Sequence, residues 1–370
     1  MRRDLDASNR LPGRRTGDAA ALALLLTLAA CGHEADVPAP APPTSPPVAR
    51  PVTALPPAPI VLRFGGFAAA REALRTRVLP AFAQAWNKTQ PQRVKIRTLF
   101  AGGEDLADAL DADFPADVAV LAPPHDFDAL RTRGSTAPAS RHLPYGGVVC
   151  RSLVVLAVRK GNPLGIRDWS DLTRPEVRVT TPDPTESGCG VWNLAAMFGA
   201  AMRGHAGVPA NDADAARTFI DRVRTNVVAS GASAHEAFVT FLGGAGDVAI
   251  TYESELAQAW MFGHDVERVL PSSTVLVESS AVLLDHNVDR HGTRTVAQAL
   301  LEHLWTTDAQ VLLANCGLRP VDPVAAAGRE LQFPLPADLW TIEQLGGWPH
   351  VGEQIQRLLT AATAPASPAK

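Results

Sequence analysis

The sequence predicts an α/β protein built from two lobes, the second inserted into the first. The chain has 370 residues, which is enough for two domains of ordinary size. From residue 60 onward, short apolar segments alternate with segments of helical periodicity. Loops of glycine, serine and alanine follow several of these apolar segments. This alternation favours a wound parallel sheet with helices packed against it.

The composition is typical of a globular protein and excludes several classes of function. Hydrophobic residues make up 46% of the chain and charged residues 19%. A net charge of −4 provides no basic surface, so we expect no nucleic-acid partner. The histidines are scattered and are not paired at ligand spacing, so we expect neither a metal site nor a cofactor.

The first 31 residues are predicted to be a signal peptide. Arginines precede the apolar run 19–30, which is too short to span a bilayer but suits a signal-peptide core. The run ends in Leu28-Ala29-Ala30-Cys31-Gly32, which resembles the bacterial lipobox. The resemblance implies that Cys31 is acylated, which makes the chain a membrane-anchored lipoprotein of the periplasm. A secretory signal with an incidental cysteine is the alternative.

Residues 32–58 are predicted to form a linker. Proline and alanine dominate this stretch, a composition that cannot pack a core and that favours an extended, semi-rigid tether. Three cysteines remain if Cys31 carries a lipid, and their number is odd. A disulfide between Cys150 and Cys316 stays open, because the spacing neither requires nor forbids it.

Apolar runs and helical periodicity predict the elements in chain order. Strands are expected at 60–64, 94–97, 117–121, 147–158, 177–181, 226–229, 247–251 and 274–284. Helices are expected at 71–86, 106–110, 125–133, 191–203, 213–224, 235–242, 296–305 and 308–314. Pro80 should break or kink the first helix, because proline lacks the amide that a helix interior needs.

Three loops of small residues are expected to bind an anion. Ser187 and Gly188 precede a predicted helix, and Ser187 suits the N-cap position. The first amides of a helix have no internal partner and carry the positive end of its dipole. The segments 230–233 and 101–103 repeat this arrangement after other strands. All three loops should therefore meet at the carboxyl edge of the sheet, where α/β folds bind ligands.

A set of motifs is distributed along the chain: 158–163 (VRKGNP), 168–172 (DWSDL), 181–184 (TPDP), Ser187-Gly188, Trp192-Asn193, Asp247-Val248, Tyr252-Glu253, Pro271-Ser272, Arg319-Pro320 and 346–348 (GGW). These motifs resemble the bacterial sulfate/thiosulfate-binding proteins, which are receptors of ATP-binding-cassette importers. They extend over residues 60–348. The resemblance implies the type II periplasmic binding protein fold, in which a hinge joins two lobes and the ligand lies in the cleft between them. Lobe one would comprise 59–145 and 254–350, lobe two 146–253, and 351–370 would be a tail.

The resemblance also implies a ligand set made of hydrogen-bond donors. The family's serine-glycine-glycine loop falls on Ser187, Gly188 and Cys189, its alanine amide on Ala232, its tryptophan donor on Tyr252 and its lobe-one serine on Gly103. Tyr252 donates through a hydroxyl rather than an indole, and Gly103 offers only its amide. The expected function is an extracytoplasmic receptor that hands sulfate to a permease and its ATPase.

The choice of ligand depends on acceptors. Sulfate carries no proton at neutral pH, whereas hydrogen phosphate keeps one and needs an acceptor such as a carboxylate. The question is whether Glu186, Asp183, Glu104 or Glu236 points into the cleft. Thiosulfate, molybdate, phosphate or an organic sulfonate are therefore alternatives to sulfate.

Two alternatives from other classes of protein stay open. A thiol at a helix start can have a lowered pKa, which would suit a cysteine hydrolase built on Cys189 with His205 or His235. We expect that the chain is not an enzyme, because no nucleophile elbow surrounds Cys189. A lipoprotein without transport, acting as an interaction module, is the other alternative.

Overall fold

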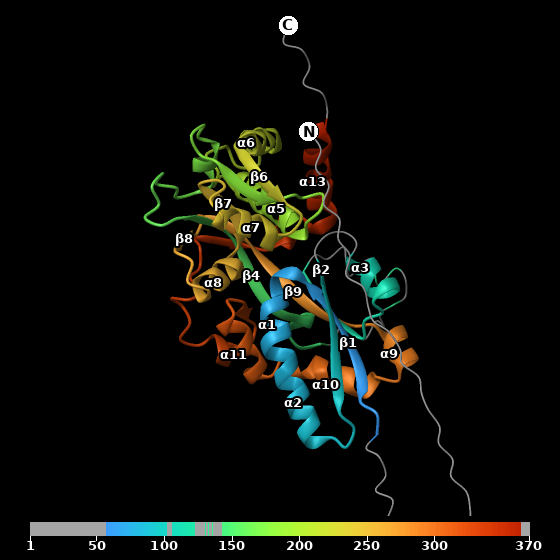
Figure 1. Cartoon of the computed structure of the whole chain (residues 1–370). Helices are drawn as coiled ribbons and strands as arrows, with labels where there is room; N and C mark the ends of the chain where they lie inside the picture. Colours follow the sequence, from blue (N-terminus) through green and yellow to red (C-terminus); the bar gives the residue numbers. More distant parts are fainter. Residues whose placement is uncertain are drawn as a thin grey trace, which may run out of the picture. The chain divides into compact units, whose positions relative to one another are not determined.

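A computed structural model describes residues 57–101, 106–122, 130, 132, 135 and 143–363. Figure 1 shows the elements. The strands are β1 (Ile60–Phe67), β2 (Val94–Ala101), β3 (Val118–Leu121), β4 (Val148–Arg159), β5 (Val179–Pro182), β6 (Val227–Gly231), β7 (Val248–Tyr252), β8 (Val266–Val269), β9 (Ser273–Leu283), β10 (Arg319–Pro320) and β11 (Asp338–Trp340). The helices are α1 (Arg71–Ala73), α2 (Leu79–Thr89), α3 (Leu106–Asp108), α5 (Gly188–Met202), α6 (Ala213–Thr225), α7 (Ala234–Leu242), α8 (Glu253–Met261), α9 (Asp285–His291), α10 (Arg294–His303), α11 (Thr307–Asn315), α12 (Pro323–Ala326) and α13 (Gly347–Thr363).

The predicted α/β class is confirmed, and the sheet joins two parallel groups of strands. Its order is β2-β1-β3-β9-β4-β7-β5-β6. Strands β1, β2 and β3 run parallel, as do β5, β6 and β7. Between them, β9 and β4 pair antiparallel with each other and with their outer neighbours. The middle of the sheet is therefore antiparallel, which the expectation of a wound parallel sheet did not include.

Strand β4 links the two groups. Its first half pairs with β9 and β10, whereas residues Val154 to Val158 pair with β7. The strand is apolar along nearly its whole length and almost entirely buried, which is what a strand covered on both faces requires. The long apolar run in the sequence thus corresponds to a single crossing strand, and Figure 1 shows it alongside β9.

Pro80 does not end the first helix. The π-helical turn Leu74–Val78 connects α1 to α2, and Pro80 lies in the first turn of α2. The amide of Leu79 donates to the carbonyl of Leu74, five residues earlier. Because the wider turn changes the hydrogen-bond register just before the proline, the missing proline amide leaves no gap in the helix.

One further expectation differs from the structure, and one open question is answered. The segment 351–370 was expected to be a tail, yet its described part belongs to α13, which packs against α5 and buries Val351, Ile355 and Leu358. The sequence left a disulfide between Cys150 and Cys316 open, and the structure has both cysteines free and buried. Burial raises the pKa of the Cys150 thiol to about 12, which keeps it protonated. The predicted helix 125–133 lies almost wholly outside the described residues.

The motif 168–172 fastens a loop to the sheet rather than forming a binding site. It forms the 3₁₀ helix Trp169–Thr173, which Asp168 and Asp171 close with a capping box. The indole of Trp169 donates to the carbonyl of Ser273 at 2.7 Å. The Asn226 amide donates to the carbonyls of Leu172 and Arg174, both at 2.8 Å.

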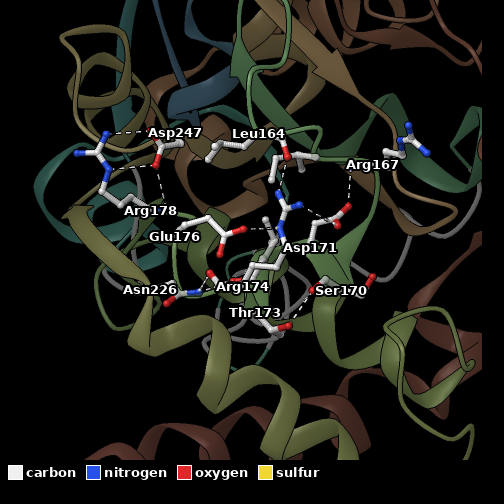
Figure 2. A network of polar contacts seen from close by, with 12 residues as sticks. Leu164, Arg167, Ser170, Asp171, Thr173, Arg174, Glu176, Arg178, Asn226 and Asp247 are labelled. Carbon is white, nitrogen blue, oxygen red and sulfur yellow. Dashed lines mark hydrogen bonds and ion pairs between the residues drawn. The ribbon is translucent and has the colours of Figure 1, made fainter.

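The same region contains a group of arginine contacts, which Figure 2 shows around Arg174. Arg174 donates to the carbonyl of Leu164 at 2.6 Å and lies near the carboxylates of Asp171 and Glu176. Beside it, Arg178 binds Asp247 with two hydrogen bonds of 3.0 and 2.9 Å. These contacts hold the start of β5 against the start of β7, whose far ends carry the candidate site.

Candidate functional site

The start of α5 presents backbone amides without acceptors. Ser187 is the N-cap residue, and only 3% of its surface is exposed. The predicted N-cap position is confirmed, but the Ser187 hydroxyl makes no capping hydrogen bond to the first turn. Among the described residues, none accepts from the amides of Gly188, Cys189 or Gly190. The first turn therefore offers several N–H donors at the positive end of a 15-residue helix.

Gly190 fixes where this helix begins. A methyl group at Gly190 would lie 2.6 Å from the Pro184 nitrogen and 2.7 Å from the Asp183 carbonyl carbon. The bare backbone at this position therefore lets the helix pack on the preceding loop. Asp183 stays in that loop, where its carboxylate accepts from the amide and hydroxyl of Thr185 at 2.8 and 2.7 Å. Asp183 thus acts as a turn residue.

Tyr252 reaches the same place from β7. Asn193 holds the two elements together, because its side-chain amide donates to the carbonyl of Ile250 at 2.9 Å and to the hydroxyl of Thr181 at 3.0 Å. Tyr252 is almost fully buried, and its side chain interacts with the Cys189 thiol. Burial, the thiol and Glu255 together raise the pKa of Tyr252 well above its usual value, so the phenol stays a donor.

The amides at the start of α7 already have acceptors within the same segment. Ser233 caps the helix by accepting from the amide of Glu236 at 3.1 Å. The Glu236 carboxylate in turn accepts from the amide of Ala232 at 3.1 Å. The Ala232 amide, predicted to hold the anion, is therefore paired with Glu236 in this structure. The carboxylate occupies the position that an anionic ligand of Ala232 would take.

A contact between Glu255 and His235, which was not predicted from the sequence, lies beside these donors. Glu255, in the first turn of α8, is only 3% exposed, and its charge acts on both Cys189 and Tyr252. Its carboxylate lies 3.4 Å from Nδ1 of His235, which is in the first turn of α7. A carboxylate three residues after Tyr252, in the first turn of the helix that follows the strand, is the signal that could have identified Glu255.

The group of strands β1, β2 and β3 contacts the candidate site through the segment that follows β1. The 3₁₀ turn Ala68–Ala70 packs against α7, and Gln258 donates to the carbonyl of Ala69 at 3.5 Å. Arg71 donates to the carbonyl of Phe100 at 3.2 Å, and its charge acts on His235. The structure thus brings together the starts of α5, α7 and α8 with the segment after β1. Gly103 and Cys31 lie outside the described residues.

The Cys189 thiol is not activated as a nucleophile. Burial and the nearby charge of Glu255 raise the pKa of Cys189 well above its usual value. His235 pairs with Glu255, and His205 lies beyond the other end of α5, where it contacts Ser272. No hydrogen bond within the described ranges joins either histidine to the Cys189 thiol, and the raised pKa keeps that thiol protonated, which argues against the cysteine-hydrolase alternative.

A buried ion pair lies at the residue that follows Tyr252. Glu253 follows Tyr252 directly, and Arg319 binds both of its carboxylate oxygens. Arg319 also donates to the carbonyls of Phe333 and Pro334 at 3.1 and 2.6 Å. This network ties the end of β7 to β10 and to the loop after α12.

Metal clusters and membrane-spanning helices are two other features by which a site can be recognised. No group of three or more histidine, cysteine, aspartate or glutamate side chains there could hold a metal ion. No helix within the described ranges has the length and apolar character needed to cross a bilayer.

Comparison with known proteins assigns a family. A family model described as "Bacterial extracellular solute-binding protein" matches residues 67–319. The chain is 36% identical over 273 residues to a sulfate-binding protein of Escherichia coli, covering 72% of this chain and 82% of the relative. It is 30% identical over 275 residues to a thiosulfate-binding protein of Pseudomonas aeruginosa, covering 73% and 81%.

A solved structure gives the same assignment. The sulfate-binding protein SubI of Mycobacterium tuberculosis superimposes with a TM-score of 0.71 at 32% identity, covering 80% of this chain and 98% of SubI. The fold is that of the type II periplasmic binding proteins. The motifs quoted from the sequence and these matches agree, and the chain therefore belongs to the bacterial extracellular solute-binding proteins, in the family of sulfate- and thiosulfate-binding proteins.

Proposed function

We propose that this protein is the extracytoplasmic receptor of an ATP-binding-cassette importer for sulfate. The observation that carries the proposal is the start of α5, where amides without a described acceptor lie beside the Tyr252 hydroxyl. A dianion without protons needs a site made of donors, and buried donors without partners are costly unless a ligand pairs with them. Relatives named for sulfate binding support the same ligand.

The proposed ligand set keeps the six positions predicted from the sequence. Cys189, Gly188 and Ser187 supply amides and a hydroxyl from α5, and Tyr252 supplies its phenol. The Ala232 amide joins them when the ligand displaces the Glu236 carboxylate, and Gly103 closes the site from the other lobe. Residues 59–145 and 254–350 would move as one lobe and 146–253 as the other, with β4 and β9 as the hinge.

The proposed setting is the periplasm, with delivery of the ion to a permease and its ATPase and with no catalytic step. Acylation of Cys31 would anchor the chain, and residues 32–58 would hold the receptor away from the lipid surface. Cell fractionation tests the anchor: the protein should remain with the membranes, and Cys31→Ala should release it or block its processing. Wild-type protein found only in the soluble fraction would exclude the lipid.

Calorimetry on the full chain tests the ligand. Titration with sulfate should release or absorb heat with a stoichiometry of one, and thiosulfate, molybdate and phosphate should compete to different extents. Failure of sulfate to bind, together with binding of another of these ions, would change the ligand and keep the receptor role.

Hydrogen phosphate is the second candidate, because two carboxylates lie at the donors. Glu236 accepts from the Ala232 amide, and Glu255 lies beside Tyr252 and Cys189. Either one could accept the proton that hydrogen phosphate carries, whereas sulfate has none to give. Tighter binding of phosphate than of sulfate at neutral pH would favour this candidate.

A further inference from the structure

A contact between the buried carboxylate of Glu255 and the partly exposed imidazole of His235 lies beside the candidate donors. Glu255 is 3% exposed and contacts Nδ1 of His235 at 3.4 Å, while its charge reaches the Cys189 thiol and the Tyr252 hydroxyl. The two residues come from the first turns of different helices, α8 and α7. The pair therefore spans the elements that supply the donors for the anion.

The carboxylate poses an electrostatic problem for a dianion. A negative charge held in the interior beside the donors repels a bound oxyanion, and low polarity strengthens that repulsion. A proton on His235 removes the problem, because an imidazolium cancels the charge of Glu255. With Nδ1 on Glu255, Nε2 stays available to donate a hydrogen bond to another acceptor.

We infer that His235 is a further residue of the oxyanion site: held by Glu255, it acts as a protonated donor that neutralises the buried carboxylate and allows a dianion to bind. The inference rests on the proposed function and adds a specificity-determining pair to it. The affinity for a proton-free dianion then depends on pH, although the ion itself does not titrate. Binding should be strong where His235 carries its proton and weak where it does not.

The charges around His235 support this assignment. Glu255 faces it from α8, and its hydrogen bond raises the pKa of His235, whereas partial burial and the Arg71 charge act in the opposite direction. Glu236 lies next to it on α7 but is engaged by the Ala232 amide. Cys189 and Tyr252 remain uncharged because burial raises the pKa of each. The proton on His235 is therefore one determinant of the charge beside the donors, together with the Glu236 carboxylate that the ligand would displace from Ala232.

Calorimetry with sulfate across about pH 6 to about pH 9, at constant ionic strength, tests the inference on the full chain. The His235 side chain is 66% exposed, so His235→Gln should fold. We expect wild-type affinity to fall about tenfold with rising pH, since one charge next to the ion is lost. His235→Gln should bind at the weak level at every pH. Glu255→Gln should bind tightly at every pH, and the double variant should lie near it.

A matched control and a second ion separate the outcomes. His264→Gln changes an exposed histidine outside the site and should keep the wild-type profile. Flat wild-type affinity, or an unchanged slope in Glu255→Gln, would overturn the inference and leave the sulfate receptor intact. Thiosulfate and selenate also lack protons in this range. A slope with one of them and no binding of sulfate would keep the pair and overturn the proposed ligand. Absence of binding by all three ions would overturn both.

Discussion

Arg319 binds Glu253 through two hydrogen bonds in the interior, and Glu253 is the residue that follows the candidate ligand residue Tyr252. The side chains are 9% and 2% exposed, and one contact, from Nη2 to Oε2, measures 3.0 Å. Burial raises the pKa of Glu253 even though Arg319 opposes the rise. The carboxylate is thus ionised only with help from its partner, and the position of Tyr252 depends on that partner remaining in place.

Removing Arg319 should therefore destabilise the protein strongly. We expect Arg319→Met to lower the free energy of unfolding by about 3 kcal/mol, because the buried carboxylate of Glu253 would lose both hydrogen bonds and keep Arg268, 3.8 Å away, as its remaining charged partner. Arg178→Met is the matched control: Arg178 also binds a carboxylate twice, but its side chain is 57% exposed, so the loss should be about 1 kcal/mol or less. Urea unfolding measures both, and equal losses would contradict the buried role of Arg319.

Gly190 should not tolerate a side chain. Its added methyl group would lie 2.6 Å from the backbone of Pro184, so Gly190→Ala should cost about 1–3 kcal/mol and weaken anion binding by moving the start of α5. Gly352→Ala provides the comparison, because nothing lies within 4 Å of the added methyl group and alanine favours a helix. Thermal unfolding should show the first variant losing stability and the second gaining. A stable Gly190→Ala would show that the loop yields easily.

The Tyr252 hydroxyl should contribute directly to ligand binding. Tyr252→Phe removes one donor and should weaken sulfate binding about tenfold, with little change in the melting temperature. Tyr145 is the only other tyrosine in the chain and is 46% exposed, so Tyr145→Phe is a matched control. Calorimetry on both variants tests the prediction, and equal affinities would remove Tyr252 from the ligand set.

The contact between Arg203 and Asp338 should add acid-sensitive stability. Arg203 holds the pKa of Asp338 at about 2, below its ordinary value near 3.8. Because the folded state lowers this pKa, the stabilisation is present above about pH 4 and is lost as the pH falls through about 2. Its size is about 2 kcal/mol, reduced somewhat by exposure of the Arg203 side chain.

Asp338→Asn should abolish that part of the pH dependence. The free energy of unfolding, measured between about pH 6 and about pH 2.5, should change less in this variant than in the wild type. Asp265→Asn, at a carboxylate 65% exposed to solvent, should leave the profile unchanged. The same slope in Asp338→Asn as in the wild type would show that other carboxylates dominate acid unfolding.

Much of the fold follows from patterns in the sequence. The run 147–158 predicted β4, because few segments other than a doubly covered strand are so uniformly apolar. The start of α5 was expected at residue 191, whereas the helix begins at Gly188. Glycines disfavour helix in isolation, and here the packing of Gly190 on Pro184 overrides that preference.

The site was only partly predictable. The Cys189 and Tyr252 side chains interact, and Ser187 is the N-cap residue of the same helix, since these residues follow strands at one edge of the sheet; their role as ligands stays a prediction. Helix α8 was not predicted, and neither was the burial of Glu253 and Glu255 in its first turn, because carboxylates at a helix start ordinarily face solvent. Their partners Arg319 and His235 are distant in sequence, so only the folded chain shows that the two carboxylates are buried.

The edge-to-face packing of Trp192 on Trp348 provides a built-in optical reporter. The ring centroids lie 4.8 Å apart, and Trp192 is one helical turn beyond Cys189. Occupancy of the helix start should change the surroundings of that indole, and with it the intrinsic fluorescence of the protein. Capture of an ion can then be followed in a stopped-flow cuvette without any attached dye. Replacing Trp348 by phenylalanine would show how much of the emission change depends on this contact.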